Sequence, residues 1–182
     1  VVPVINSILP AFDIVVATQD WHPRNHGSFA ANHLGAQIGE VITLGHLPQM
    51  LWPIHCVQET EGAQFHPALD VSGLDGVFQK GTDPAVDSYS GFFDNGRAHS
   101  TGLGEFLKSR GIAQVYVSGL ATDYCVKWTA LDALGLGFET FVVTDATRGV
   151  NISPNDSEDA LREVIAAGGQ VVTSPQIAGP RW

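Results

Sequence analysis

Asp20 and His22 lie two residues apart at the end of an apolar run, and this spacing is suited to binding a metal ion. In an extended strand, side chains two residues apart project to the same side, so a carboxylate and an imidazole can meet at one ion. His55 is a further candidate ligand from a separate part of the chain. Two imidazoles and one carboxylate leave coordination positions open, which suits one divalent ion that acts on a substrate, with Zn²⁺ preferred over Fe²⁺ or Mn²⁺. A single loop histidine is more often ordinary polar surface.

Cys125 follows the apolar run 114–118 through a short glycine-containing turn and opens a segment with a helical pattern. The sulfur atom is therefore expected near a helix N-terminus, where the dipole and the free amides favour a thiolate. The same amides are placed to bind an oxyanion. The alternative for a cysteine in an apolar helix is a small buried hydrophobic side chain. We expect that alternative for Cys56.

Lys80 ends another apolar run and is followed by Gly81. Partial desolvation at this position is expected to lower its proton affinity, which makes the amine useful beside a thiolate or a developing oxyanion. The alternative is a lysine whose stem extends out of the strand end to place its charge in water. Neither Cys125 nor Lys80 is specific when taken by itself.

The elements that must position these residues are short β-branched runs that alternate with helical patterns, which is typical of parallel strands joined by crossover helices. The expected strands are 12–18, 76–80, 114–118, 141–144 and 170–173. The expected helices are 104–111, 123–135 and 157–168, preceded by a helical stripe at 1–12. Together they predict a three-layer α/β/α sandwich with a mostly parallel central sheet. Ligands bind outside the carboxyl ends of such strands, where the candidate residues lie.

Length and composition limit the classes of function. A chain of 182 residues without a linker or repeat predicts a single domain, 1–182, with an irregular metal-binding insertion at about 25–75. A net charge of −10 with nine Lys and Arg residues provides no cationic surface for nucleic acid or anionic lipid. No apolar run is long enough to cross a membrane. Two cysteines are too few for a disulfide-stapled secreted protein, so we expect thiols in a reducing cytoplasm.

Five blocks of the sequence together resemble the nicotinamidase, or pyrazinamidase, family of the cysteine hydrolase superfamily that includes isochorismatase. The blocks are TQDWHPRNHGSFAANH, LWPIHCVQETEGAQFHP, KGTDPAVDSYSGFFDNG, GLATDYCVKWTALDALGLGF and TDATRGVN. They occur in the family's order, near its spacing, and cover the chain from Val15 to Ser153. The resemblance implies the isochorismatase-like hydrolase fold. It also implies hydrolysis of nicotinamide to nicotinate and ammonia, and of pyrazinamide to pyrazinoate.

The resemblance implies a role for each residue around Cys125. Cys125 would be the nucleophile that attacks the carboxamide carbon, releasing ammonia and leaving a thioester that water hydrolyses. Lys80 would be the lysine of an Asp-Lys-Cys triad. A cis peptide would join Leu120 to Ala121, and the amides of Ala121 and Cys125 would form the oxyanion hole. The residues implied to bind the substrate are Trp52, which would pack on its ring, Leu120, Ala121 and Tyr89.

The same resemblance implies that Asp20, His22 and His55 are the metal ligands, and that the ion takes the ring nitrogen of the substrate. Some members use a further histidine after the Asp-x-His pair as a ligand. The spacing of His26 in this chain is better suited to a role beside the ligands than to direct coordination.

One part of the family pattern has no counterpart here. The family has a strand near its N-terminus that carries the aspartate acting as general base and a phenylalanine that lines the ring pocket. Asp13 lies at the amino end of an expected strand, on the wrong side of the sheet, and is no substitute. Without this strand, two others would face each other across an unfilled gap. We therefore expect that residues precede Val1 in the intact protein and include the general base.

Three alternatives remain open on the sequence alone. A related hydrolase acting on another small amide is one, although the implied metal ligands and Trp52 argue against it. A metallohydrolase whose metal-bound water attacks, with Cys125 only structural, is the second. An inactive remnant that kept the metal and lost the base is the third. The expected partner is a small-molecule substrate, with neither nucleic acid nor membrane, and a homo-oligomer is left open.

Overall fold

The structure, a computed structural model, describes residues 1–178, so the last four residues of the expected domain lie outside the described part. Its α-helices are α1 (Val2–Ile8), α2 (Leu103–Ser109), α3 (Lys127–Gly135), α4 (Asp156–Ala166) and α5 (Ser174–Ala178). Its strands are β1 (Val16–Asp20), β2 (Val41–Leu44), β3 (Leu47–Met50), β4 (Gly76–Lys80), β5 (Gln114–Leu120), β6 (Glu139–Arg148) and β7 (Gln170–Val172). Short 3₁₀ turns are η1 (Leu9–Ala11), η2 (Ala30–Asn32) and η3 (Glu61–Ala63), and η4 (Thr122–Val126) is one π-helical turn. None of the described helices has the length and apolarity needed to cross a bilayer.

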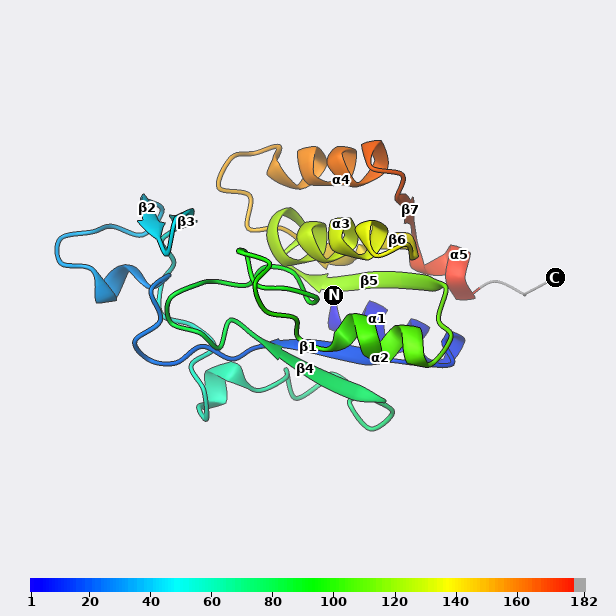
Figure 1. Cartoon of the computed structure of the whole chain (residues 1–182). Helices are drawn as coiled ribbons and strands as arrows, with labels where there is room; N and C mark the ends of the chain where they lie inside the picture. The colour runs from blue at the N-terminus through cyan, green and yellow to red at the C-terminus, as the bar shows by residue number, and fades with distance from the viewer. Residues whose placement is uncertain (179–182) are drawn as a thin grey trace.

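The parallel strands form two separate groups (Figure 1). β1 pairs with β4, and their register places Asp20 opposite Lys80. β5, β6 and β7 form the second group, in that order across the sheet. β2 and β3 form an antiparallel hairpin that projects to one side of the layers. Within residues 1–178 no ladder joins β1 to β5.

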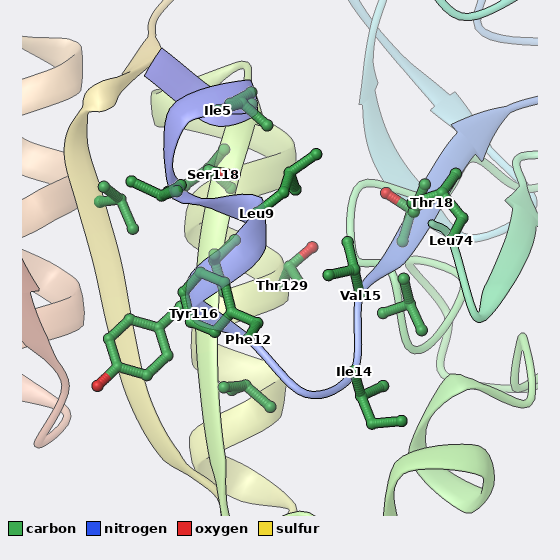
Figure 2. A pocket seen from close by; sticks show the side chains of 18 of the residues that line it. Ile5, Leu9, Phe12, Ile14, Val15, Thr18, Leu74, Tyr116, Ser118 and Thr129 are labelled. Atoms are coloured by element: carbon green, nitrogen blue, oxygen red, sulfur yellow. The ribbon is translucent and has the colours of Figure 1, made fainter. Parts of the chain in front are cut away.

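A cavity of about 1360 Å³ occupies the space between β1 and β5. Figure 2 shows side chains lining it from both strands and from the N-terminal helix, among them Thr18, Tyr116, Ser118 and Ile5. The gap expected between two strands is therefore present. Its walls are largely apolar side chains and unpaired strand edges, which a further strand would cover.

Helices cover both faces of the β5–β7 group. On one face α3 and α4 pack around Val142 of β6, and on the other α1 and α5 pack around Val143. Successive residues of a strand point to opposite faces, so this one pair of valines joins the sheet to both helical layers. α2 continues the first layer, where Leu103 and Leu107 pack against residues of β1 and β4. The three-layer α/β/α prediction with a mostly parallel sheet is confirmed.

One expected strand is displaced along the chain. The strand predicted at 12–18 is β1 at Val16–Asp20, because Phe12 ends the turn η1 and the amide of Val15 donates to the carboxylate of Asp75. The shift places Asp20 inside the strand instead of after it. The hairpin β2–β3 and the short helix α5 were not predicted, since neither segment has a regular apolar period.

Candidate active site

Lys80 lies between a thiol and a carboxylate at the carboxyl ends of the parallel strands. Its Nζ is 3.4 Å from Sγ of Cys125, donates to the carbonyl of Ser88 at 2.8 Å, and forms an ion pair with Asp20. An ammonium has three hydrogens, and these three neighbours can receive all of them. The side chain of Lys80 is only 3% exposed. The pairing of β1 with β4 explains the ion pair, because it places Asp20 directly beside Lys80.

The charge states at this group differ from the sequence prediction. Burial raises the pKa of the Cys125 thiol, and the positive charge of Lys80 reverses this only in part. Burial lowers the pKa of Lys80, but Cys125 and Asp20 raise it more, and the net direction is upward. Cys125 is therefore a thiol and Lys80 an ammonium at neutral pH. The predictions of a thiolate favoured by the helix start and of a lysine with lowered proton affinity are both wrong, because burial dominates at Cys125 and the charges of Cys125 and Asp20 outweigh burial at Lys80.

The chain reaches Cys125 through a cis peptide and the single π-helical turn η4. The peptide between Leu120 and Ala121 is cis, as the resemblance implied. The carbonyl of Ala121 then accepts hydrogen bonds from the amides of Tyr124 at 3.1 Å and Val126 at 3.0 Å. Isolated π-helical turns of this kind are frequent at functional sites. The turn brings the backbone on both sides of Cys125 to the carboxyl end of β5.

The ligand atoms of Asp20, His22 and His55 lie within 4.8 Å of one another. Nδ1 of His22 is 2.8 Å from the carbonyl oxygen of Gly81, and Nδ1 of His55 is 2.8 Å from that of Pro53. A carbonyl only accepts, so each ring carries its proton on Nδ1 and keeps the lone pair of Nε2 free, which is the usual arrangement of metal-binding histidines. Burial lowers the pKa of His22, which keeps the ring neutral. These residues fit a divalent ion.

Gly81 is required by this arrangement. A Cβ atom at position 81 would lie 2.3 Å from Cε1 of His22, and the backbone has a φ of +63°. Any other residue would displace the imidazole and strain the turn after β4. Gly81 therefore leaves the space that the imidazole of His22 occupies, although Gly81 and His22 are far apart in sequence.

Asp20 belongs to both groups, since it pairs with Lys80 and lies among the candidate ligands. Burial alone would raise the pKa of Asp20, but the charge and hydrogen bond of Lys80 outweigh burial and hold it below its usual value. The carboxylate is therefore ionised throughout the neutral range. An ion bound here would share this carboxylate with the lysine.

Asp20→Asn in metal-free protein is expected to reduce the free energy of unfolding at pH 7 by about 3 kcal/mol, as for a broken buried ion pair. The pKa of folded Asp20 lies below its ordinary value of 3.8. The contribution is thus present above that pH and is lost as the pH falls through the folded pKa. The pKa of Lys80 is raised in the folded protein. The stabilisation that Lys80 contributes is therefore lost only as the pH rises through its folded pKa. Urea denaturation at pH 7 and at decreasing acidic pH measures the difference.

The control is Asp159→Asn, which breaks the exposed pair with Arg162. That substitution is expected to change the free energy of unfolding very little at any pH, because solvent screens the exposed pair. Equal losses for the two variants, or an Asp20→Asn effect that is unchanged at acidic pH, would contradict the assignment of the buried ion pair.

An aromatic cluster stands beside the nucleophile. Nε1 of Trp52 donates to the hydroxyl of Tyr89 at 3.2 Å. The ring of Tyr124 lies 4.8 Å from that of Trp52 and 5.4 Å from that of Tyr89, measured between ring centroids. The structure thus brings together two of the predicted substrate-binding residues. Tyr124 was missed in the sequence, where its only signal was its position next to Cys125.

The other predicted site residues differ in whether they line the cavity between β1 and β5. Leu120 is 62% exposed and lines the cavity between β1 and β5. The cavity between β1 and β5 is lined by Cys125, Lys80 and Asp20, whereas Trp52 lies outside its lining. The gap in the sheet therefore reaches the nucleophile but is not lined by the aromatic cluster.

Cys56 does not compete with Cys125 as a nucleophile. It is half-buried, and both cysteines are free thiols. Burial raises the pKa of Cys56 to about 11, so its thiol stays protonated at neutral pH. No lysine nitrogen is recorded within hydrogen-bond distance of its sulfur in the described chain, in contrast to Cys125.

Comparison with known proteins places this site in a family. The chain matches the isochorismatase domain over residues 4–176. It is 53% identical over 161 residues to a nicotinamidase of Escherichia coli K12, an alignment that covers 88% of this chain and 75% of that protein. A solved nicotinamidase/pyrazinamidase of Acinetobacter baumanii superposes with a TM-score of 0.93 at 45% identity, covering 97% of this chain and 84% of the other.

A solved pyrazinamidase of Pyrococcus horikoshii in complex with zinc is also similar. It has a TM-score of 0.74 and 37% identity, and the superposition covers 94% of this chain and 84% of the other. The identities and coverage are well above what a shared fold alone requires. The chain therefore belongs to the isochorismatase family, and within it to the nicotinamidases.

Proposed function

We propose that this protein hydrolyses nicotinamide to nicotinate and ammonia, and pyrazinamide to pyrazinoate. The observation that carries the proposal is the position of Cys125 in the helical turn η4, where its sulfur lies 3.4 Å from Nζ of the buried Lys80. A cysteine so placed can attack a carboxamide carbon, and its relatives include the nicotinamidase of Escherichia coli K12. The substrate is a small molecule.

The reaction then follows two steps at Cys125. Its sulfur forms a bond to the carboxamide carbon as the thiol loses its proton, the carbon–nitrogen bond breaks, and the nitrogen leaves as ammonia after taking a proton. Water hydrolyses the resulting thioester and frees nicotinate. Lys80 stabilises the sulfur while it carries negative charge, and the amides of Ala121 and Cys125 bind the developing oxyanion.

The proton of the thiol requires a base. Asp20 is a poor candidate, because Lys80 holds its pKa below the ordinary value of a carboxyl group. Asp13 is exposed at the amino end of β1, away from the carboxyl ends where Cys125 lies. The family resemblance assigns the base to an aspartate on a strand of its own, and the cavity between β1 and β5 has room for such a strand beside Lys80 and Cys125. A positioned base contributes roughly 10²–10⁴ in rate.

Asp20, His22 and His55 would hold one divalent ion, and zinc is our first choice because the similar Pyrococcus structure is a complex with zinc. A bound ion would supply a Lewis acid for the ring nitrogen of the substrate and would so help to orient the ring. Trp52 packs on the ring, and Tyr89 fixes the indole through its hydroxyl. Leu120 and Ala121 complete the surface against the carboxamide.

We expect ammonia release from nicotinamide by the metal-loaded protein, and a loss of at least about tenfold when a chelator removes the ion. Benzamide, which has the same carboxamide but no ring nitrogen, is the control substrate. It is expected to be hydrolysed slowly and with little response to the chelator. Without ammonia release from the loaded protein, the proposed function fails. Equal chelator sensitivity for both substrates would contradict only the role of the ion.

We also propose that residues 1–182 form a single hydrolase domain with its metal-binding insertion at about 25–75. Of the cluster Asp20, His22 and His55, the last residue lies within that segment and the other two shortly precede it. Catalysis requires Cys125 as a free thiol, and both cysteines are free in the structure. A reducing compartment such as the cytoplasm maintains this state.

A further inference from the structure

Gln49 of β3 is a buried glutamine that has no task in the proposed reaction. Its side chain is 3% exposed, and of the residues that the structure describes in β2 and β3 it alone is buried. A primary amide taken out of water is costly unless hydrogen bonds replace the water. The partners of Gln49 therefore indicate what this side chain holds together.

The amide nitrogen of Gln49 has three acceptors. Nε2 is 2.7 Å from the carbonyl oxygen of Met50, 3.0 Å from Oδ2 of Asp87 and 3.2 Å from the hydroxyl oxygen of Tyr89. A carbonyl oxygen only accepts, so the contact with Met50 requires the nitrogen end of the amide on this side. The two hydrogens of this nitrogen are shared among the three acceptors. Gln49 therefore joins a buried carboxyl group on the loop after β4 to the tip of an aromatic ring.

The hydroxyl of Tyr89 also holds the indole of Trp52, whose Nε1 donates to it at 3.2 Å. An indole N–H only donates, as does the amide nitrogen of Gln49, so both approach the lone pairs of the same oxygen. The backbone of Trp52 is fixed separately, because its amide donates to the carbonyl of Ser28 at 2.8 Å and its carbonyl accepts from the amide of Ala30 at 2.9 Å. The backbone contacts thus fix the position of Trp52, and the hydroxyl fixes the orientation of its ring.

The backbone of Tyr89 is likewise held without Gln49. Its amide donates to Oδ1 of Asn95 at 3.0 Å, and the amide of Asn95 donates to the carbonyl of Asp87 at 2.7 Å. Gln49 therefore acts on the hydroxyl end of the Tyr89 ring and not on the course of the loop. Its removal is expected to free the orientation of the two side chains while the backbone around them stays in place.

We propose that Gln49 is a positioning residue for the aromatic cluster of Trp52, Tyr89 and Tyr124, and that it determines how tightly this cluster binds the ring of the substrate. The inference rests on the proposed function, in which Trp52 packs on that ring. The ring itself is unchanged while the carboxamide reacts, so its contacts are the same in the ground state and in the transition state. Loosening them raises KM and leaves kcat nearly unchanged.

Gln49→Met is the test, because methionine has a similar length and no hydrogen-bond donor. For the metal-loaded full chain we expect KM for nicotinamide to rise by roughly fivefold or more, the scale of one lost hydrogen bond, with kcat within about twofold of wild type. The dissociation constant of nicotinamide, measured by calorimetry in the Cys125→Ala background, is expected to rise by a similar factor. If Gln49→Met does not fold, as judged by circular dichroism, Gln49→Leu replaces it with the same expected result.

Tyr89→Phe distinguishes positioning from a general structural role. It removes the hydroxyl through which Gln49 acts and keeps the aromatic ring. Adding Gln49→Met to Tyr89→Phe is therefore expected to change the dissociation constant of nicotinamide by less than about twofold. A glutamine that only supported the hairpin would weaken binding by the same factor with and without the hydroxyl.

Gln170→Met is the matched control. Nε2 of Gln170 donates to a carboxylate oxygen of Glu139 at 3.2 Å, at the amino end of β7, so this variant also loses a bond between an amide and a carboxyl group. We expect KM and kcat as in wild type, because neither residue contacts the aromatic cluster.

Three results would overturn the inference about Gln49. They are an unchanged KM in Gln49→Met, a loss confined to kcat, and full additivity of Gln49→Met with Tyr89→Phe. Absence of nicotinamide binding by Cys125→Ala would also overturn it, since the cluster would then hold no ring. Ammonia release by wild type is measured separately, and nicotinamide that binds but is not hydrolysed would refute the proposed function alone.

Discussion

Cys125→Ala is expected to lower ammonia release from nicotinamide by roughly 10⁴–10⁶-fold, the scale seen when a catalytic nucleophile is removed. The substitution removes the only described sulfur held against a lysine nitrogen, at 3.4 Å. No thioester can then form, and the remaining groups only bind and polarise the amide. Ammonia release measures the rate, and mass spectrometry of the protein during turnover detects the acyl adduct in wild type and its absence in the variant.

Cys56→Ala is the matched control, since it makes the same substitution at the other free cysteine. Burial raises the pKa of Cys56 to about 11, so its thiol stays protonated at neutral pH, and we expect activity close to that of wild type. The alternative mechanism, in which metal-bound water attacks and Cys125 is structural, makes the opposite prediction for Cys125→Ala. If that variant retains most of the activity and remains sensitive to chelator, the cysteine mechanism is wrong.

Lys80→Met is expected to reduce kcat by roughly 10²–10³-fold, as for the loss of one preorganised charge at the reacting atoms. Burial raises the pKa of Cys125, and the positive charge of Lys80 lowers it in part. Without the ammonium, the thiol ionises at higher pH. The acid limb of the kcat/KM profile should therefore shift to higher pH in the variant. A substitution that only loosened the fold would lower activity without moving this limb.

Lys108→Met is the control for this prediction. Lys108 is an exposed lysine near the end of α2, away from Cys125, and its replacement is expected to change neither kcat nor the pH profile. Lys80→Met also leaves Asp20 without its cation, so a loss of about 3–5 kcal/mol in unfolding free energy is expected in addition. A pH profile that matches wild type would show that Lys80 has no electrostatic effect on Cys125.

Much of the fold could be predicted because it depends on local pattern. The strand at Gly76–Lys80 has the predicted bounds, and β5 begins at Gln114 as expected. Cys125 is found in the first part of a helical segment, as its surroundings indicated, although the glycine of the expected turn, Gly119, lies within β5. Such features follow from apolar periodicity and turn residues within about ten positions, which can be read directly along the chain.

The charge states could not be predicted in this way. Whether Cys125 is a thiol depends on how deeply it is buried and on Lys80, which lies 45 residues away in sequence. The pairing of Lys80 with Asp20 depends on the register of β4 against β1, which no local pattern specifies. Desolvation and charge act through space, and each reversed an expectation drawn from the neighbours in sequence.

Residue types and their spacing were thus enough to identify the thiol, the lysine and the Asp-x-His pair, because chemical identity and strand periodicity are local properties. The partners of these groups became known only from the folded chain. His26 and Asp87 come within ligand distance of His22 because the loop after β4 folds back onto the insertion, which places residues 61 positions apart side by side. Their burial depends on tertiary contacts between segments distant in sequence, which no local pattern specifies.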